Sequence, residues 1–245
     1  MNITDDIMDR FATKFPGSIQ LYSCATPNGI KVACALEELK DLRESFNDFS
    51  YEAHTLDIRT NPPESRAMLP FLDINPNGKI PALVDPQGKG GKVTVFESGA
   101  CLLYLAEKYE ELIPTHGPLR YDVMKWLFWG STGVSSQFKR FGFYYHYCPH
   151  DLPYCLNRYT NECKRLLHVL DTQLASHGKH WIVGYLYSVA DICVWPWVHA
   201  LHENYGDAME LVFNKLHDYP HVKQWYARCM SRPAVKRSLL ITKFL

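Results

Sequence analysis

The sequence lacks an excess of charge of either sign and has no long apolar run. Its 245 residues contain 26 Lys and Arg and 26 Asp and Glu, so the formal net charge is zero. A chain without a basic field has no electrostatic attraction for nucleic acid or anionic lipid, so neither is expected as a partner. The longest apolar stretch, residues 100–106, is far shorter than the roughly 20 residues that cross a bilayer, so no membrane span is predicted.

The chain also lacks a Cys-x-x-Cys pair, and no secretory leader is expected at its start. Its eight cysteines are scattered, and several lie in apolar helical stretches, which indicates reduced, buried thiols in a cytoplasmic protein. The start is acidic and has no apolar signal-peptide core, so residues 1–17 are predicted to be a polar tail. Histidine and cysteine groupings at residues 146–150 and 199–202 lack an evident third ligand, so no metal site is predicted.

What is present fits a globular protein with two kinds of domain. Apolar residues make up 47% of the chain and charged residues 21%, which suffices for a buried core. In the first part, hydrophobic periodicity and turn residues predict strands and helices in the order β-α-β-β-β-α. The predicted segments are strand 19–22, a helix from residue 27, strand 51–56, a hairpin of 80–84 and 92–96, and helix 98–109. This order is the thioredoxin-like arrangement, predicted for residues 18–112.

The second part of the chain is predicted to be all-α. Residues 113–119 contain two prolines and a glycine without periodicity, so they are interpreted as a linker. Helical patterns follow at residues 120–137, 154–174, 189–205 and 220–232, within a domain predicted to span 120–245. Ser188 and Asp191 have the spacing of a capping box, a structural feature with no chemical role expected. The fold class is therefore α+β, a thioredoxin-like domain followed by an all-helical one.

Thr26, Pro27 and Asn28 follow the first predicted strand and allow two interpretations. Threonine is a good N-cap and proline suits the first helical position, so the segment is explained as a helix start. The same helix start presents unpaired N–H groups and a partial positive charge, which favour the thiolate form of a sulfur placed there. The Thr26 hydroxyl and the Asn28 amide can both donate hydrogen bonds to that sulfur, which lowers its pKa at about 1.4 kcal/mol per unit.

Two further segments offer backbone and polar groups to an extended peptide. Ile80-Pro81 opens a strand, where the bond is either cis or that of an ordinary strand-edge proline, and the Ile80 backbone is left to pair with a bound peptide. Ser98 is expected to cap the next helix and to form, with the N–H groups behind it, a seat for an α-carboxylate. Glu97 can pair with an α-amino group. Taken singly, the two residues are better explained as a plain cap and a solvated acid.

Taken together, these segments resemble the glutathione transferases, and within them the bacterial nu class and the related fungal nitrogen-regulator proteins. The resemblance covers most of the chain from Ile19 onward. The segments that carry it are residues 21–32, 75–83, 95–108, 126–129, 143–149, 157–171, 188–197 and 232–237.

The resemblance implies a two-domain homodimer that uses glutathione as a cosubstrate. It places the glutathione thiol against Thr26 and Asn28, the predicted catalytic residues. It also implies that the Ile80 backbone pairs with the cysteinyl part, and that Arg158 binds a glutathione carboxylate; without the resemblance, Arg158 would be interpreted as a surface arginine. The full set predicted to bind glutathione is Asn28, Arg66, Lys79, Ile80, Pro81, Glu97, Ser98 and Arg158.

Three positions depart from the class or stay open. Arg66 stands where the class usually has a glutamine that contacts glutathione, after a Pro-Pro insertion. Residues 137–140 replace a glycine-rich run before the aromatic segment, which puts the acceptor pocket in doubt. Cys24 lies two residues before Thr26 and is interpreted either as a small packed residue or as a thiol able to form a mixed disulfide.

The function expected from this resemblance is reduction of a small disulfide by two glutathiones, with no nucleophile on the protein. One alternative is a regulatory protein that binds glutathione and turns over slowly, as the fungal relatives suggest. Another keeps catalysis and changes the reaction to peroxide reduction or conjugation. The same fold serves all three, so the fold cannot decide among them.

Overall fold

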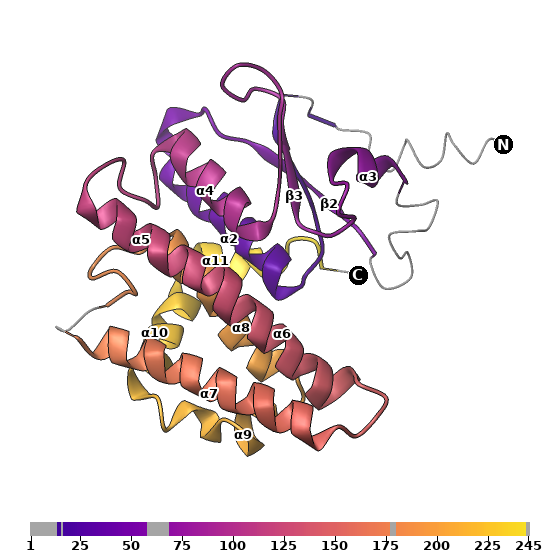
Figure 1. The fold of residues 1–245 in the computed structure, drawn as a ribbon. Coiled ribbons are helices and arrows are strands. Elements are labelled where there is room, and N and C mark those ends of the chain that lie inside the picture. Colours follow the sequence, from indigo (N-terminus) through magenta and orange to yellow (C-terminus); the bar gives the residue numbers. More distant parts are fainter. Residues whose placement is uncertain (1–13, 16, 58–68, 177–179, 244–245) are drawn as a thin grey trace. The chain divides into compact units, whose positions relative to one another are not determined.

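The computed structural model describes residues 14–15, 17–57, 69–176 and 180–243, and the chain divides into two compact units (Figure 1). The first unit comprises residues 1–109 together with 234–245, and the second comprises residues 110–233. The first contains a four-stranded sheet with helices, and the named elements of the second are all helical. The predicted fold class, a thioredoxin-like domain and an all-helical domain, is confirmed.

The sheet of the first unit has the strand order β2-β1-β3-β4. Its strands are β1 (Ile19–Ser23), β2 (Tyr51–Thr55), β3 (Ala82–Asp85) and β4 (Val93–Phe96). Strand β1 pairs parallel with β2 and antiparallel with β3, and β3 pairs antiparallel with β4 as the predicted hairpin. Helices α2 (Pro27–Leu42) and α4 (Ser98–Tyr109) pack against each other and against the sheet, and a short η1 (Glu44–Phe46) follows α2. Figure 1 shows α3 (Leu69–Ile74), which the sequence did not predict, apart from that helix pair.

Strand alternation builds a core on each face of this sheet. On one face, Tyr22, Ala82 and Val84 pack against Phe71 of α3. Leu21 and Leu83 are fully buried and alternate with these residues, so they face the opposite side, which α2 and α4 cover. Full burial of one such side chain stabilises the fold by about 1.5–3 kcal/mol. The two packed faces hold the ends of the strands in register, and this register positions the site described below.

The end of the chain belongs to the first unit, whereas the sequence predicted a single helical domain through residue 245. Helix α11 (Pro233–Ser238) carries Arg237, whose guanidinium ion-pairs with Glu37 and, at 2.6 Å, with Asp41, both on α2. The hydrogen bond to Asp41 is the largest cause that raises the pKa of Arg237, and the hydrogen bond to Glu37 is the next. The Ala25 N–H donates to the Thr242 carbonyl at 3.1 Å. These pairs join residues about 200 positions apart, and periodicity along the chain cannot predict them.

Replacement of Arg237 by alanine is expected to loosen this terminal segment. The change leaves the Glu37 carboxylate, whose side chain is 3% exposed, without its cation. We expect a loss of about 1–2 kcal/mol, below the range for fully buried pairs because the Arg237 side chain is 39% exposed. Hydrogen exchange of the Ala25 amide measures the effect, and it should be faster by about tenfold for each 1.4 kcal/mol lost. The exposed neighbour Lys236, replaced by alanine, is the control; equal exchange in the two variants contradicts the account.

In the second unit, one long helical path runs from residue 118 to 147 and contains two π-helical segments. It consists of α5 (Pro118–Phe128), a π-helical η3 (Trp129–Val134), α6 (Ser135–Gly142) and a second π-helical segment, η4 (Phe143–Tyr147). Trp129, Ser135 and Phe143, which cap successive segments, all keep right-handed helical backbone angles, so the path is not broken. The sequence predicted a helix over residues 120–137, which includes the first π-helical segment, and did not predict that the path continues to residue 147.

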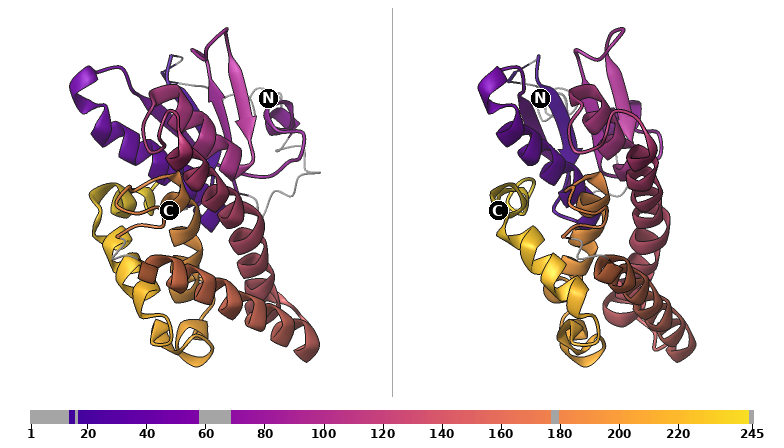
Figure 2. Two further views of the ribbon diagram at one scale, coloured as in Figure 1. Left: turned by 60° about the vertical axis from the view of Figure 1, so that its left-hand side comes forward. Right: turned by 90° about the vertical axis from the view of Figure 1, so that its left-hand side faces the viewer.

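The other helices of this unit agree with the predicted segments to within two residues. They are α7 (Pro153–Ala175), α8 (Val189–Glu203) and α10 (Pro220–Ser231), with two short additions, α9 (Ala208–Leu211) and η6 (Asn214–Leu216). Helix α7 packs against α6 and α10, and α8 is buried along most of its length. Figure 2 gives two further views of the same elements.

The predicted capping box at the start of α8 is confirmed, and its acid does more than the prediction assigned to it. Asp191, completely buried, accepts from the Ser188 N–H at 3.1 Å, while the Ser188 hydroxyl accepts from the Ala190 N–H at 3.3 Å. Asp191 also accepts from the Ile182 N–H at 2.9 Å and from the Trp225 indole at 2.8 Å. One carboxylate therefore joins the start of α8 to a loop and to α10.

This carboxylate makes stability depend on pH. Burial raises the pKa of Asp191 to about 6, although its hydrogen bonds oppose that shift. Between pH 4 and pH 6 the unfolded carboxyl ionises while the folded one keeps its proton, so rising pH favours unfolding. Relative to Asp191→Asn, the native chain should lose about 2–3 kcal/mol of unfolding free energy between pH 4 and pH 7. Urea unfolding of both proteins measures this difference, and a difference that does not change with pH contradicts it.

Candidate functional site

The three segments singled out from the sequence meet at one end of the sheet. Tyr22 pairs with Ala82, and Ala82 pairs with Phe96. The chain therefore leaves β1, enters β3 and leaves β4 at neighbouring positions. Thr26 to Asn28 follow β1, Ile80 and Pro81 precede β3, and Glu97 and Ser98 follow β4. Strand register alone brings these segments to the same edge.

Thr26 caps a helix, as the first interpretation predicted, and its hydroxyl hydrogen can still be donated to a sulfur, as the second requires. It is the N-cap of α2, with extended backbone, and its hydroxyl oxygen accepts from the Gly29 N–H at 3.3 Å. A hydroxyl that accepts through its oxygen can still donate its hydrogen, so the cap does not use up the donor. A side chain at Gly29 would meet the Cys24 carbonyl oxygen at 2.0 Å, which makes glycine necessary for this close approach of the helix start to the preceding loop.

Asn28 and Ser98 are joined directly. The Ser98 hydroxyl donates to the Asn28 side-chain oxygen at 3.5 Å, although 70 residues separate the two in the sequence. Because the amide oxygen is the acceptor in this bond, the two N–H hydrogens of Asn28 are not used by it. Asn28 is half-buried and Ser98 is buried, so the bond fixes the amide at the beginnings of both helices.

Ser98 does not cap α4 in the way the sequence predicted. The helix begins at Ser98 itself, and the carbonyl of Glu97 accepts the Cys101 N–H at 2.9 Å. That prediction was wrong because the chain bends one residue earlier. Glu97 has a φ of 70°, the left-handed region that a residue with a side chain occupies at a cost of about 1–3 kcal/mol. Glu97 is exposed, so its carboxylate is accessible at this edge.

The segment before β3 contains three of the predicted residues. The Ile80–Pro81 bond is cis, the first of the two alternatives. Pro81 is buried, Ile80 is half-buried and Lys79 is exposed. The Lys79 carbonyl accepts from the buried Asn75 amide at 2.5 Å, which holds the turn that leads into the strand.

The structure describes two of the three positions that departed from the class or stayed open. Arg66 lies outside the described residues. Residues 137–140, which replace the glycine-rich run of the class, lie within α6, where Phe138 is buried. Cys24 is 2% exposed, which favours the packed residue over a reactive thiol.

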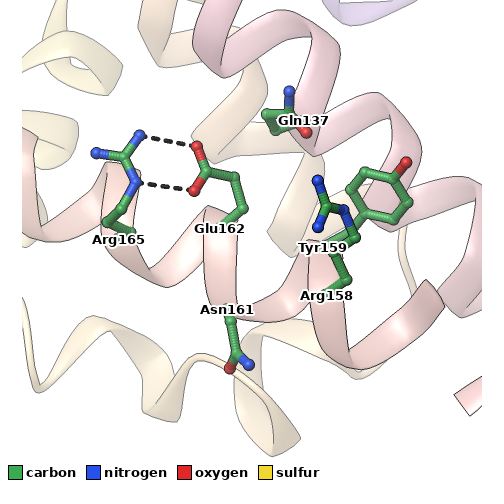
Figure 3. A pocket seen from close by; sticks show the side chains of 6 residues that line it. All are labelled: Gln137, Arg158, Tyr159, Asn161, Glu162 and Arg165. Carbon is green, nitrogen blue, oxygen red and sulfur yellow. Dashed lines mark hydrogen bonds and ion pairs between the residues drawn. The ribbon is translucent and has the colours of Figure 1, made fainter. Parts of the chain in front are cut away.

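Arg158 lies in the second unit, on the wall of a polar pocket formed by α6 and α7 (Figure 3). The pocket has a volume of about 440 Å³ and is lined by Gln137, Arg158, Tyr159, Asn161, Glu162 and Arg165. Glu162 and Arg165 form a bidentate ion pair with both N–O distances at 2.8 Å. Within the part of the chain that the structure describes, Arg158 has no ion-pair partner. The sequence predicted Arg158 but not Asn161, Glu162 or Arg165, because their helical spacing is that of any solvated face.

Two further observations bear on the class of site. Among the described residues, no group of three or more His, Cys, Asp or Glu side chains is arranged to hold a metal ion. In the same residues, no helix combines the length and the apolar character that a membrane crossing requires.

Comparison with known proteins identifies relatives of both units. The family model for the glutathione S-transferase N-terminal domain matches residues 32–108, and that for the C-terminal domain matches residues 157–233. The disulfide-bond oxidoreductase YghU of Escherichia coli is 40% identical over 226 residues, which cover 92% of this chain and 75% of that protein.

Solved structures agree with this result. A glutathione transferase family member from Pseudomonas fluorescens, crystallised with two glutathione bound, has a TM-score of 0.85 and 39% identity, covering 96% of this chain and 98% of its own. A glutathione transferase from Pseudomonas putida, crystallised with one glutathione disulfide per subunit, has a TM-score of 0.83 and 35% identity, with 98% of each chain covered.

Proposed function

Because the chain belongs to the glutathione S-transferase family, we propose that it is a glutathione-dependent disulfide-bond reductase that relies on the glutathione sulfur for its chemistry. The observation that carries this proposal is the meeting of Thr26, Asn28 and Ser98 at the starts of two helices. Helix starts and hydroxyl and amide donors stabilise a thiolate. Cys24 is buried, so no described residue of the loop before Thr26 offers an exposed sulfur as nucleophile.

The proposed reaction has two exchange steps. The glutathione thiolate attacks one sulfur of a small disulfide, a mixed disulfide forms, and the other half leaves as a thiolate that takes up a proton. A second glutathione thiolate then attacks the glutathione sulfur of the mixed disulfide, and glutathione disulfide and the second half leave. Two electrons pass from two glutathiones to the substrate, so no other reductant is required. The protein contributes ionisation and alignment of the sulfur.

The remaining predicted residues are assigned to binding of the rest of the tripeptide. In this proposal the Ile80 backbone pairs with the cysteinyl part, and Glu97 binds the α-amino group of the γ-glutamyl end. The backbone N–H groups at the start of α4, from Ser98 onward, bind its α-carboxylate, because the Ser98 hydroxyl hydrogen is donated to Asn28. Exposure of Glu97 and the left-handed backbone beside Ser98 support these roles, because strain of this kind concentrates at ligand sites. Lys79, Pro81 and Arg66 stay predicted members of the site, and a homodimer stays a prediction.

Arg158 offers a test with a matched control on the same helix. We expect Arg158→Ala to weaken glutathione binding by about tenfold or more, the loss of one hydrogen bond between charged groups. Arg165→Ala removes an identical guanidinium two turns along α7, but that group is already paired with Glu162, so less than about a twofold change is expected. Isothermal titration with glutathione measures both values. Equal dissociation constants for the two variants would remove Arg158 from the site.

The reaction itself is tested by steady-state rates with glutathione and three acceptors: hydroxyethyl disulfide, cumene hydroperoxide and an aromatic chloride. The proposal expects the disulfide to be the best substrate. If cumene hydroperoxide or the aromatic chloride is the best substrate, the protein is a peroxidase or a conjugating transferase, and the proposed disulfide reduction is wrong. Tight binding of glutathione with no turnover of any acceptor would favour a regulatory protein.

A further inference from the structure

Cys148 and Cys155 are the two cysteines that the proposed site leaves unused and that solvent can reach. The other six cysteines are buried. Burial raises the pKa of the Cys101 and Cys163 thiols, which makes them poor nucleophiles. Cys148 and Cys155 are only partly buried, and both lie at the turn between η4 and α7. Among the cysteines, these two are therefore the candidates for exchange with a disulfide in solution.

Cys148 and Cys155 lie on the two sides of the turn that joins η4 to α7. Tyr144 of η4 stacks on Tyr159 of α7, with ring centroids 5.3 Å apart and an interplanar angle of 6°. One turn before Tyr144, the Arg140 guanidinium lies 5.9 Å from the same Tyr159 ring, so this face of the path looks toward α7. Cys148 comes four residues after Tyr144, and Cys155 comes four residues before Tyr159. The stacked pair holds the end of η4 against α7, so the two cysteines, each four residues from this pair, lie at the same end of the hairpin.

The electrostatics of Tyr144 agree with this placement. The charge of an ionised Cys155 is the largest cause that raises the pKa of Tyr144, and a hydrogen bond between the two side chains and the charge of Cys148 add to it. This direction agrees with the position of the two cysteines beside the stack of Tyr144 on Tyr159. Cys148 follows the last helical residue and has extended backbone, with φ of −66° and ψ of 125°, so its side chain is not fixed by continuation of the helix. A disulfide requires the two α-carbons to lie within about 7 Å of each other, so closure requires the end of η4 to bring Cys148 to that distance from Cys155.

From this juxtaposition we propose that Cys148 and Cys155 form a dithiol that exchanges with glutathione disulfide and closes to an intramolecular disulfide. The thiolate of one cysteine attacks glutathione disulfide, a mixed disulfide forms, and one glutathione leaves as its thiolate. The second cysteine, as its thiolate, attacks the protein sulfur of that mixed disulfide, and the second glutathione leaves. The protein loses two electrons and two protons, and glutathione disulfide is reduced to two glutathiones. This dithiol proposal rests on the proposed function only because its oxidant, glutathione disulfide, is the product of the proposed reaction.

The test uses the full-length chain, fully reduced and then treated with glutathione disulfide. After alkylation of remaining thiols, peptide mass spectrometry should find Cys148 and Cys155 linked to each other and protected from the reagent. A neighbouring thiol acts at an effective concentration of millimolar order or higher, so the linked form should exceed the mixed disulfide by about tenfold or more. Cys148→Ser and Cys155→Ser should each stop with one glutathione bound to the remaining cysteine.

Two outcomes overturn the proposal: both thiols stay open to alkylation in the native chain, or each binds a glutathione without closure. The same experiment on Asn28→Ala separates this proposal from the proposed function. Closure in that variant, with disulfide reductase turnover lost, supports both. Closure in a chain that never reduces hydroxyethyl disulfide supports the dithiol and contradicts only the enzyme activity.

Discussion

Asn28→Ala is expected to lower turnover of hydroxyethyl disulfide by about tenfold or more, the loss of one hydrogen bond to a developing or bound thiolate. The reason lies in the geometry of the amide. Its oxygen accepts from the Ser98 hydroxyl at 3.5 Å, which leaves its N–H hydrogens for an anion at the start of α2. Alanine removes the donor and keeps the helix, because Thr26 provides the cap. Steady-state kinetics with varied glutathione measure kcat and kcat/KM for both proteins.

Asn28→Asp provides the matched variant for this prediction. Aspartate keeps an oxygen that can accept from Ser98, but it replaces the N–H donor by a second oxygen and adds a negative charge. We expect turnover at least as low as that of the alanine variant, since a carboxylate beside the sulfur disfavours the thiolate. Unchanged turnover in either variant removes Asn28 from the mechanism. Ser98→Ala should give a smaller loss in kcat, because it releases the amide without deleting it.

The second large effect concerns stability. Asp191→Ala is expected to lower the unfolding free energy by about 3 kcal/mol at pH 7. The change leaves the N–H groups of Ile182, Ser188 and Trp225 buried without an acceptor, each at a cost of about 1–3 kcal/mol. Relief of the buried charge offsets part of this cost, since burial raises the pKa of Asp191 to about 6.

Equilibrium unfolding in urea, followed by tryptophan fluorescence, measures the loss. Ser188→Ala is the control, because it removes the helix cap and keeps the carboxylate, and we expect it to cost only about 1 kcal/mol. If the two variants lose the same free energy, the bonds from Asp191 to Ile182 and Trp225 contribute nothing, and its role reduces to the capping box.

The sequence was a good guide wherever the determining contacts are local. The helix starts at Thr26 and Ser188 follow from side chains that bond backbone within three residues. Hydrophobic alternation and turn residues likewise predicted the hairpin of β3 and β4. Strand register then brings Thr26, Pro81 and Glu97 to one edge of the sheet. Taken alone, each of these segments is explained at least as well by an ordinary structural role, such as a helix cap or a strand-edge proline.

Where distant contacts or backbone geometry decide, sequence reasoning failed. The sequence gives no sign that Arg237 returns to α2, because the acids it pairs with are about 200 residues away. The π turns after Phe128 carry no distinctive residue pattern. Ser98 was assigned the cap because serine favours that position, but the left-handed backbone of Glu97 moves the helix start by one residue.

We propose that this protein ionises a sulfur brought by glutathione, and the ultraviolet absorption of the bound thiolate reports that ionisation. The difference spectrum between the protein with and without glutathione, titrated over pH, gives the pKa of the bound thiol. The account expects that pKa to lie at least about one unit below the 8.5 of an unperturbed cysteine thiol, and to return toward it in Asn28→Ala. A bound thiol that titrates as in free solution, or the same value in both proteins, contradicts the account.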